Sequence, residues 1–234
     1  MRDYIYYAGK TLSDFNTFIT DAGIYSSPDR GYESIEVPGR NGNLLFEDDK
    51  FGNVEHAYPM IILDDFNRNY AALKAFLLSK RGYNELYDTF YPDEFYLATF
   101  KKIENLKQQY LHGTVGSCVL VFERKPQRFL KSGWKEYEYT ASGSINNPTE
   151  FDALPLLRVY GSGTVTVNGT PIVISTTQTY LDIDCELQEV LQSGGNLDIT
   201  LTNGVFPKLK SGDNTITKGS GITKIIVTPR WWTL

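Results

Sequence analysis

Residues 161–174, with the sequence GSGTVTVNGTPIVI, decide the fold class of the second half of the chain. Thr164-Val-Thr-Val167 and Pro171-Ile-Val-Ile174 are rich in the β-branched residues that favour strands. Between them stands Asn168-Gly169, a pair whose residues tolerate the positive φ of a tight turn. Gly161-Ser-Gly163 is similar to a glycine-rich phosphate-binding loop, but it precedes a strand. Because no helix begins there, no helix N-terminus is available to bind a phosphate. The segment therefore predicts two short strands joined by a turn.

Short strands and glycine turns recur across the rest of this half. Further runs of apolar and β-branched residues occupy 158–160, 180–183, 197–201, 215–217 and 224–227. Glycine-containing turns such as Gly219-Ser-Gly221 separate many of them. About seven or eight short strands at this spacing are typical of a β-sandwich. We therefore expect a C-terminal domain made of strands and turns.

A shift in composition near residue 134 divides the chain. The chain is 14% aromatic, and three quarters of its aromatic residues lie within residues 1–134. The stretch 141–148, ASGSINNP, is small and polar and ends in Asn-Pro, which is typical of turns and linkers. We expect an N-terminal domain at residues 1–135, a linker at 136–147 and a C-terminal β-sandwich at 148–234.

The first half predicts one helix, at residues 67–80, among strands. Four apolar or aromatic residues recur at three- and four-residue spacing and share one helix face: Tyr70, Leu73, Phe76 and Leu77. Asn67 or Asn69 is suited to cap the start, and Gly82 suits the left-handed position after the end. Residues 119–122, VLVF, predict a strand buried on both faces. The expected fold class is mainly β with one α-helix: an N-terminal α+β or β-sandwich domain followed by the C-terminal sandwich.

The sequence offers little for catalysis. It holds only 2 His and 2 Cys in 234 residues. Cys118 lies within an apolar strand and is expected in the core, and neither His56 nor His112 has partners at nucleophile or zinc spacing. Asp182 and Asp184 alternate with apolar residues and are expected on the solvent face of a strand, where a hydrated surface is favoured over a cation site. We predict no enzyme activity, no catalytic residue, no metal and no cofactor.

Charge and hydropathy exclude other classes of function. The formal net charge is -5, which disfavours a non-specific grip on nucleic acid. The sequence contains no apolar run near the ~20 residues that span a bilayer, so no membrane partner is expected. An apolar signal region is not visible after Met1, and we expect folding in a reducing cytoplasm.

Two features remain as candidates for interaction. Seven cations gather around residues 101–131, with few acids among them: Lys101, Lys102, Lys107, Arg124, Lys125, Arg128 and Lys131. They form either a solvated face or a contact surface for an acidic partner, and the run Glu47-Asp-Asp49 in the same half has the opposite sign. The second feature is Trp231-Trp232, of which one is expected to anchor the last strand in the core and the other to be exposed.

Several stretches, taken in order, resemble siphophage distal tail proteins. In the first half these are VPGRNG at 37–42, the predicted helix running into GYNEL at 82–86, and FERKPQRFL at 122–130. In the second half these are NPT at 147–149, ALPL at 153–156, VYGSG at 159–163, FPKLKSGDNTI at 206–216 and PRWW at 229–232. The resemblance covers nearly the whole chain.

The resemblance implies a structural role in a phage virion. Proteins of this family form a hexameric ring at the distal end of a long non-contractile tail. The N-terminal domains build the ring, an extended arm embraces the next subunit, and galectin-like or carbohydrate-module-like sandwiches lie at the periphery. The implied partners are further copies of the chain, the tail tube protein, the tape-measure protein and a tail-associated lysin or fibre protein, with DNA only in transit at ejection. The implied location is the tail tip, after assembly in the host bacterial cytoplasm.

Within this sequence we expect the arm at residues 31–56. The candidate assembly residues are Val37, Pro38, Gly39, Arg40, Arg124, Lys125 and Arg128. An alternative function is a carbohydrate-binding module or adhesin for host cell-wall glycans, which the C-terminal sandwich and Trp231-Trp232 motivate. A glycosidase or peptidase acting on cell walls is a third hypothesis, for which no residue gives positive support.

Overall fold

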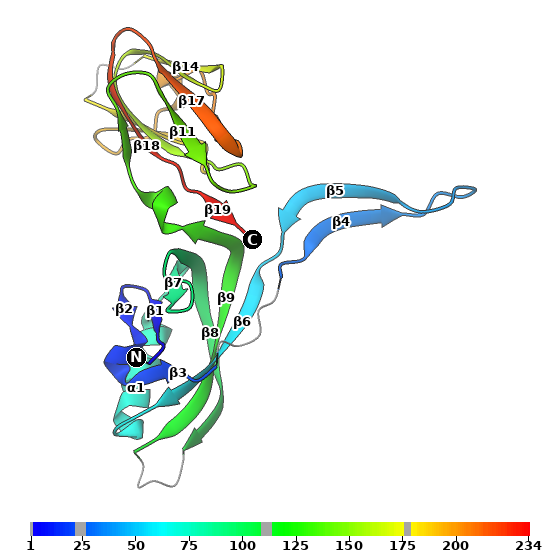
Figure 1. Cartoon of the computed structure of the whole chain (residues 1–234), viewed down its shortest axis with the longest axis vertical. Coiled ribbons are helices and arrows are strands. Elements are labelled where there is room, and N and C mark those ends of the chain that lie inside the picture. The colour runs from blue at the N-terminus through cyan, green and yellow to red at the C-terminus, as the bar shows by residue number, and fades with distance from the viewer. Residues whose placement is uncertain (1, 22–26, 109–113, 176–178) are drawn as a thin grey trace. The chain divides into compact units, whose positions relative to one another are not determined.

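A computed structural model of the chain describes residues 2–21, 27–108, 114–175 and 179–234. The chain forms two compact units (Figure 1). The first comprises Met1–Arg128 with Leu234, and the second comprises Phe129–Thr233. Within the described residues there is one α-helix, and most of the regular structure is strand. The expected mainly β fold class with one helix is confirmed.

The first unit is built on a sheet that joins residues far apart in sequence. Across it the strands run in the order β2 (Lys10–Thr11), β1 (Ile5–Tyr7), β7 (Asn84–Asp88), β8 (Glu94–Gln108), β9 (Gly116–Leu130), β6 (Val54–Ile62) and β3 (Thr17–Ile19). Strand β6 pairs antiparallel with β9 from Val54 opposite Arg124 to Ile62 opposite Gly116. Alternate residues of β6 are buried, as a sheet with one covered face requires.

Helix α1 (Phe66–Ser79) confirms the predicted helix and its buried face. Leu73 and Leu77 are fully buried, and Tyr70 and Phe76 pack against the same core. Gly82 is left-handed, as expected, with a φ of 67°. The expectation for the N-cap was wrong: the Asp65 carboxylate accepts the Arg68 N–H, because the helix begins one residue earlier than predicted.

Neither Asn67 nor Asn69, which were expected as caps, caps the helix. The Asn69 side chain reaches backwards and donates to the Leu63 carbonyl at 2.9 Å. Asn67 is exposed on the helix surface. The turn before the helix is therefore held from two sides, by Asp65 and by Asn69.

The second unit is a sandwich of two sheets around one core. One sheet has the order β10 (Tyr137–Tyr139), β18 (Ile222–Thr228), β12 (Leu156–Gly161), β15 (Leu181–Asp184) and β16 (Glu189–Gln192). The other has the order β11 (Gly143–Asn147), β17 (Gly212–Lys218), β13 (Gly163–Val167) and β14 (Thr170–Ile174). Apolar residues from both sheets form a single buried cluster. Short 3-10 helices η2 (Lys131–Trp134) and η3 (Ile199–Leu201) and strand β19 (Trp232–Thr233) complete the unit, and η1 (Leu12–Phe15) lies in the first.

The Asn168-Gly169 turn has the expected geometry. Asn168 and Gly169 have φ of 50° and 80°, and Val167 pairs with Thr170 across them. Positive φ at both turn residues defines a two-residue hairpin turn whose backbone twist matches that of the flanking strands.

Two parts of the second unit differ from expectation. The run 197–201 is not a strand: Asp198 accepts the Thr200 N–H and starts the 3-10 helix η3. The segment 136–147, expected as a linker, contains β10 and β11, and the compact units divide between Arg128 and Phe129. Its small polar residues occupy the exposed positions of β11, while Ile145 and Asn147 are buried.

The packing of α1 generates a prediction that compares adjacent leucines. Leu77 is fully buried and Leu78 is 60% exposed. Leu77→Ala should lower the free energy of unfolding by about 2–5 kcal/mol, because it leaves a cavity in the core. Leu78→Ala should change it by no more than ~0.5 kcal/mol. Denaturant unfolding measures both, and equal losses would contradict the assigned helix face.

Candidate functional site

The strands β4 (Arg30–Ile35) and β5 (Leu44–Phe51) form a two-stranded sheet of their own (Figure 1). We call residues 30–51 the arm. Ile35 pairs with Leu44 and Tyr32 with Glu47, and a register shift lies between Arg30 and Tyr32. The arm falls within the segment 31–56 where an extended arm was expected, apart from its first residue.

The arm exposes large apolar side chains on both faces. Their exposed fractions are Tyr32 63%, Leu45 55%, Phe46 54%, Ile35 41% and Leu44 37%. The register places Tyr32 and Leu45 on one face and Ile35, Leu44 and Phe46 on the other. Exposed apolar side chains gathered in this way are typical of surfaces that contact another molecule.

Polar contacts fix the shape of the arm without covering it. Arg30 lies 3.4 Å from the Glu47 carboxylate and its guanidinium lies over the Phe51 ring at 5.7 Å. Asn43 Nδ2 donates to the Ser34 hydroxyl at 2.7 Å near the tip. Because these groups are exposed, their contribution to stability is small.

The predicted residues Val37, Pro38, Gly39 and Arg40 form the tip of the arm. The Arg40 N–H donates to the Val37 carbonyl at 3.2 Å, and Gly39 has a φ of 80° that favours glycine. Arg40 is exposed. The structure thus gathers these four residues at one place, and their role in an interface stays a prediction.

The root of the arm is held by three contacts. The Gly52 N–H donates to the Asp29 carbonyl at 3.1 Å and closes the hairpin. Asn53 Nδ2 then donates to the Tyr83 hydroxyl at 2.7 Å and to the Glu123 carboxylate at 2.9 Å. Sequence reasoning missed Asn53, because both of its partners are distant in the chain.

The predicted cations of β9 do not share one surface. Arg124 is 3% exposed and its guanidinium lies over the Tyr96 ring at 4.0 Å, so it does not present a charge at the surface. Lys125 lies over Tyr83 at 5.3 Å. Arg128 lies 2.9 Å from the Glu94 carboxylate and over the Tyr91 ring at 5.6 Å. Lys125 and Arg128 therefore each lie against a different exposed tyrosine, Tyr83 and Tyr91 respectively.

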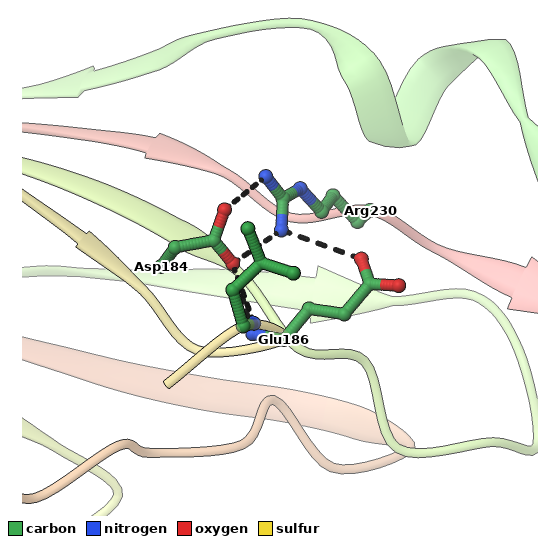
Figure 2. Close-up of polar contacts among 4 residues, drawn as sticks. Asp184, Glu186 and Arg230 are labelled. Atoms are coloured by element: carbon green, nitrogen blue, oxygen red, sulfur yellow. Dashed lines mark hydrogen bonds and ion pairs between the residues drawn. The ribbon is translucent and has the colours of Figure 1, made fainter. Parts of the chain in front are cut away.

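The two acids of β15, Asp182 and Asp184, each form an ion pair with an arginine. Asp182 accepts two hydrogen bonds from Arg158, at 2.7 and 2.9 Å. Asp184 accepts two from Arg230, both at 2.8 Å, and Arg230 also lies 3.5 Å from Glu186 (Figure 2). Asp184 is 7% exposed, so its expected place on the solvent face was wrong. Arg230, which lies in the C-terminal segment, covers the Asp184 carboxylate and shields it from solvent.

The Arg230–Asp184 pair acts as a clasp within the second unit. The Arg230 N–H donates to the Gly133 carbonyl at 2.7 Å, and its guanidinium lies 5.7 Å from the Trp134 ring. Asp184 also accepts the N–H groups of Glu186 and Leu187. Burial raises the pKa of Asp184, but hydrogen bonds from Arg230 and these N–H groups outweigh it, and the pKa is lowered from 3.8. No cluster of three metal-ligating side chains occurs in the described residues.

The groups with nucleophilic chemistry are buried. Burial raises the pKa of Cys118 to about 11 and of Cys185 to about 12, so neither is a thiolate at neutral pH. His56 is buried against the Tyr58 ring, with ring centroids 4.3 Å apart. His112 lies outside the described residues.

The two tryptophans near the C-terminus are both engaged. Trp231 is 2% exposed and belongs to the core. Trp232 stacks on Phe151 at 4.3 Å, and its Nε1 donates to the Asp152 carbonyl at 3.0 Å. Trp231 is therefore the tryptophan that anchors the core, while Trp232 is half-buried and packs on Phe151. No helix in the described part of the chain has the length and apolar character needed to cross a bilayer.

Comparison with known proteins shows a likeness in fold. No family model and no curated protein matches the sequence. The chain is similar to the crystal structure of the SPP1 Dit (gp 19.1) protein, described as a paradigm of the hub adsorption apparatus in Gram-positive infecting phages. The TM-score is 0.72 with 15% sequence identity, and the similarity covers 100% of both chains. The likeness in fold confirms, at the level of fold, the resemblance to distal tail proteins that the motifs indicated.

The clasp makes the stability of the second unit depend on pH. Asp184 has a lower pKa folded than unfolded, so its contribution is present above pH 3.8 and is lost as pH falls through the lower, folded value. Asp184→Asn should lower the thermal midpoint at pH 7. The difference from the parent should shrink on acidification below pH 3.8, where the parent also loses the charge. A difference that stays constant over this range would contradict the assigned ion pair.

The buried thiols give a second prediction from these residues. A maleimide or disulfide reagent at pH 8 should leave Cys118 and Cys185 unmodified in the folded chain, because little thiolate forms and access is blocked. Both should react after denaturation. Rapid native labelling of either one, counted by intact mass, would show that the assigned burial is incorrect.

Proposed function

We propose that this chain is a structural component of a siphophage tail tip that assembles into a hexameric ring. The ring connects the tail tube to tail-associated or fibre proteins and lets DNA pass at ejection. Its proposed partners are other copies of the chain, the tail tube protein, the tape-measure protein and the lysin or fibre protein below. Its proposed location is the virion tail tip, after assembly in the host bacterial cytoplasm.

The observation that carries this proposal is the arm. A two-stranded ribbon with apolar residues on both faces cannot bury them by itself. A second copy of the chain is the occupant that fits, because a closed ring uses one surface of each subunit against a different surface of the next. The full-length likeness in fold to a phage hub protein supports the same reading.

The proposed contact combines apolar burial with charge. The arm contributes Tyr32, Leu45 and Phe46, and its tip presents Arg40. On the neighbouring subunit, Lys125 and Arg128 beside exposed tyrosines offer an aromatic and cationic surface of the kind enriched at interfaces. Arg124 is not included, because its side chain is buried within its own chain.

The net charge is compatible with a channel for DNA. A charge of -5 per chain becomes more negative as subunits accumulate. Binding to a DNA backbone needs clustered cations that release its counterions. The net negative charge therefore disfavours retention of DNA and suits its transit through a channel.

The arm can be tested by removing its apolar side chains. Leu45→Ser with Phe46→Ser should weaken assembly at least tenfold, since buried anchor residues commonly contribute more than ~1 kcal/mol each. The monomer should unfold at an unchanged midpoint, because both side chains are exposed in it. Mass photometry over a concentration series, with negative-stain microscopy, measures the ring population.

Leu78→Ser is the matched control for this experiment. It removes an apolar side chain that is 60% exposed on α1, away from the arm. It should assemble like the parent. Assembly that is unaffected by the arm variant, or a parent that stays monomeric even with its tail partners, would contradict the proposal.

A further inference from the structure

Three Asn-Gly pairs occur in the chain: Asn41-Gly42, Asn168-Gly169 and Asn203-Gly204. An asparagine before glycine is chemically labile, because the glycine has no side chain to block approach of its own nitrogen to the asparagine side chain. The reaction needs the side-chain carbonyl carbon to rotate onto that nitrogen. Contacts that hold the amide in place therefore decide which pair reacts.

The two pairs in the second unit are held. The Asn168 side chain donates to Asn214 Oδ1 at 2.7 Å and accepts the Thr215 N–H at 2.9 Å. The Asn203 side chain donates to the Pro171 carbonyl at 3.1 Å and accepts the Val173 N–H at 3.2 Å. Both ends of each amide are thus engaged, and rotation must break two hydrogen bonds.

The backbone around these pairs is also fixed. Gly169 lies in a two-residue hairpin turn closed by the pairing of Val167 with Thr170. The Gly204 N–H donates to the Thr202 hydroxyl at 3.1 Å. The nitrogen that would attack is therefore restrained at both sites.

Asn41 differs from both. It is exposed at the tip of the arm, and within the described residues no hydrogen bond engages its amide or the Gly42 N–H. Asn43, two residues on, is tied to Ser34, so the restraint resumes just beyond the pair. The tip backbone turns at Gly39 and Gly42, both with φ of 80°, where glycine is the favoured residue.

We propose that Asn41 is the site at which this protein undergoes spontaneous deamidation. The Gly42 backbone nitrogen attacks Asn41 Cγ, a new C–N bond closes a five-membered succinimide, and the side-chain nitrogen leaves as ammonia with the proton that Gly42 gives up. Water then adds to either imide carbonyl and breaks one C–N bond. The products are aspartate, or isoaspartate in which the backbone runs through the side chain. Asparagine and water are consumed, and ammonia is released.

The modification changes the part of the arm that the proposed function uses. It places a carboxylate between Arg40 and Gly42, and the isoaspartate form lengthens the main chain at a tight turn by one methylene. This consequence rests on the proposed function, because it concerns docking of the arm. The deamidation itself does not depend on it.

The test incubates the purified full-length chain at 37 °C and pH 8 in heavy-oxygen water. Peptide mapping by mass spectrometry at time points follows all three asparagines in one sample, and isoaspartyl methyltransferase labelling identifies isoaspartate. Asn41 should react at least about ten times faster than Asn168 or Asn203, since each of those must first break two hydrogen bonds. Heavy oxygen should enter at Asn41.

Two comparisons sharpen the result. In guanidinium chloride the three rates should converge, because each pair then has the same glycine and no restraint. Asn41→Gln should abolish the native reaction at this position and leave the other two sites unchanged. Native rates that are equal at the three sites, or a ranking that persists after unfolding, would overturn the proposal.

The effect on assembly is read separately. Aged chain, fresh chain and Asn41→Gln that has been aged in parallel are compared by mass photometry. Weaker assembly of the aged parent alone supports the consequence. Ring formation that is identical in all three removes the consequence, while absence of rings in every sample counts against the proposed function and leaves the mass-spectrometric result standing.

Discussion

A two-stranded ribbon has two faces and no layer of its own to cover either of them. In the arm this constraint is severe, because Tyr32, Leu45 and Phe46 are each more than half exposed. The internal contacts of the arm, such as Arg30 with Glu47, define its shape but contribute little stability at the surface. The anchoring of its root through Gly52 and Asn53 fixes where it leaves the sheet. This exposed apolar surface is the basis of the proposal that a second copy of the chain buries the arm.

The rest of the chain does not share this need. Each unit has its own buried cluster, and α1 and β6 close the core of the first. In the second, the Arg230–Asp184 clasp ties the C-terminal segment to the end of β15 and to η2. A buried ion pair of this kind is costly to break, because either partner alone would leave an uncompensated charge. Cys118 and Cys185 are buried, and the Asp182 and Asp184 carboxylates are paired with arginines, so these side chains serve structure.

Sequence patterns predicted what is local. The helix face of α1 and the Asn168-Gly169 turn depend on spacing and on conformational preference over a few residues. Residues 197–201 show the limit: their alternation favours a strand, but capping by Asp198 produces a 3-10 helix. The clasp could not be predicted, since Arg230 and Asp184 are 46 residues apart.

The candidate site was predicted in part for the same reason. Turn residues at 38–42 between extended segments indicated a hairpin, but whether a hairpin joins a larger sheet depends on distant strands. The burial of Arg124 was available in the pattern: it lies two residues after Phe122 on the inward face of β9. Its charge suggested a surface position, and the alternation of the strand was the better guide.

In the proposed ring, a second copy of the chain covers the arm. Hydrogen–deuterium exchange of the isolated monomer and of the assembled fraction, separated by size, tests it most directly. If a second copy covers the arm, backbone amides in peptides from residues 30–51 should become protected on assembly, while those of α1 should exchange equally in both samples. Equal exchange of residues 30–51 in the monomer and in the ring would contradict it.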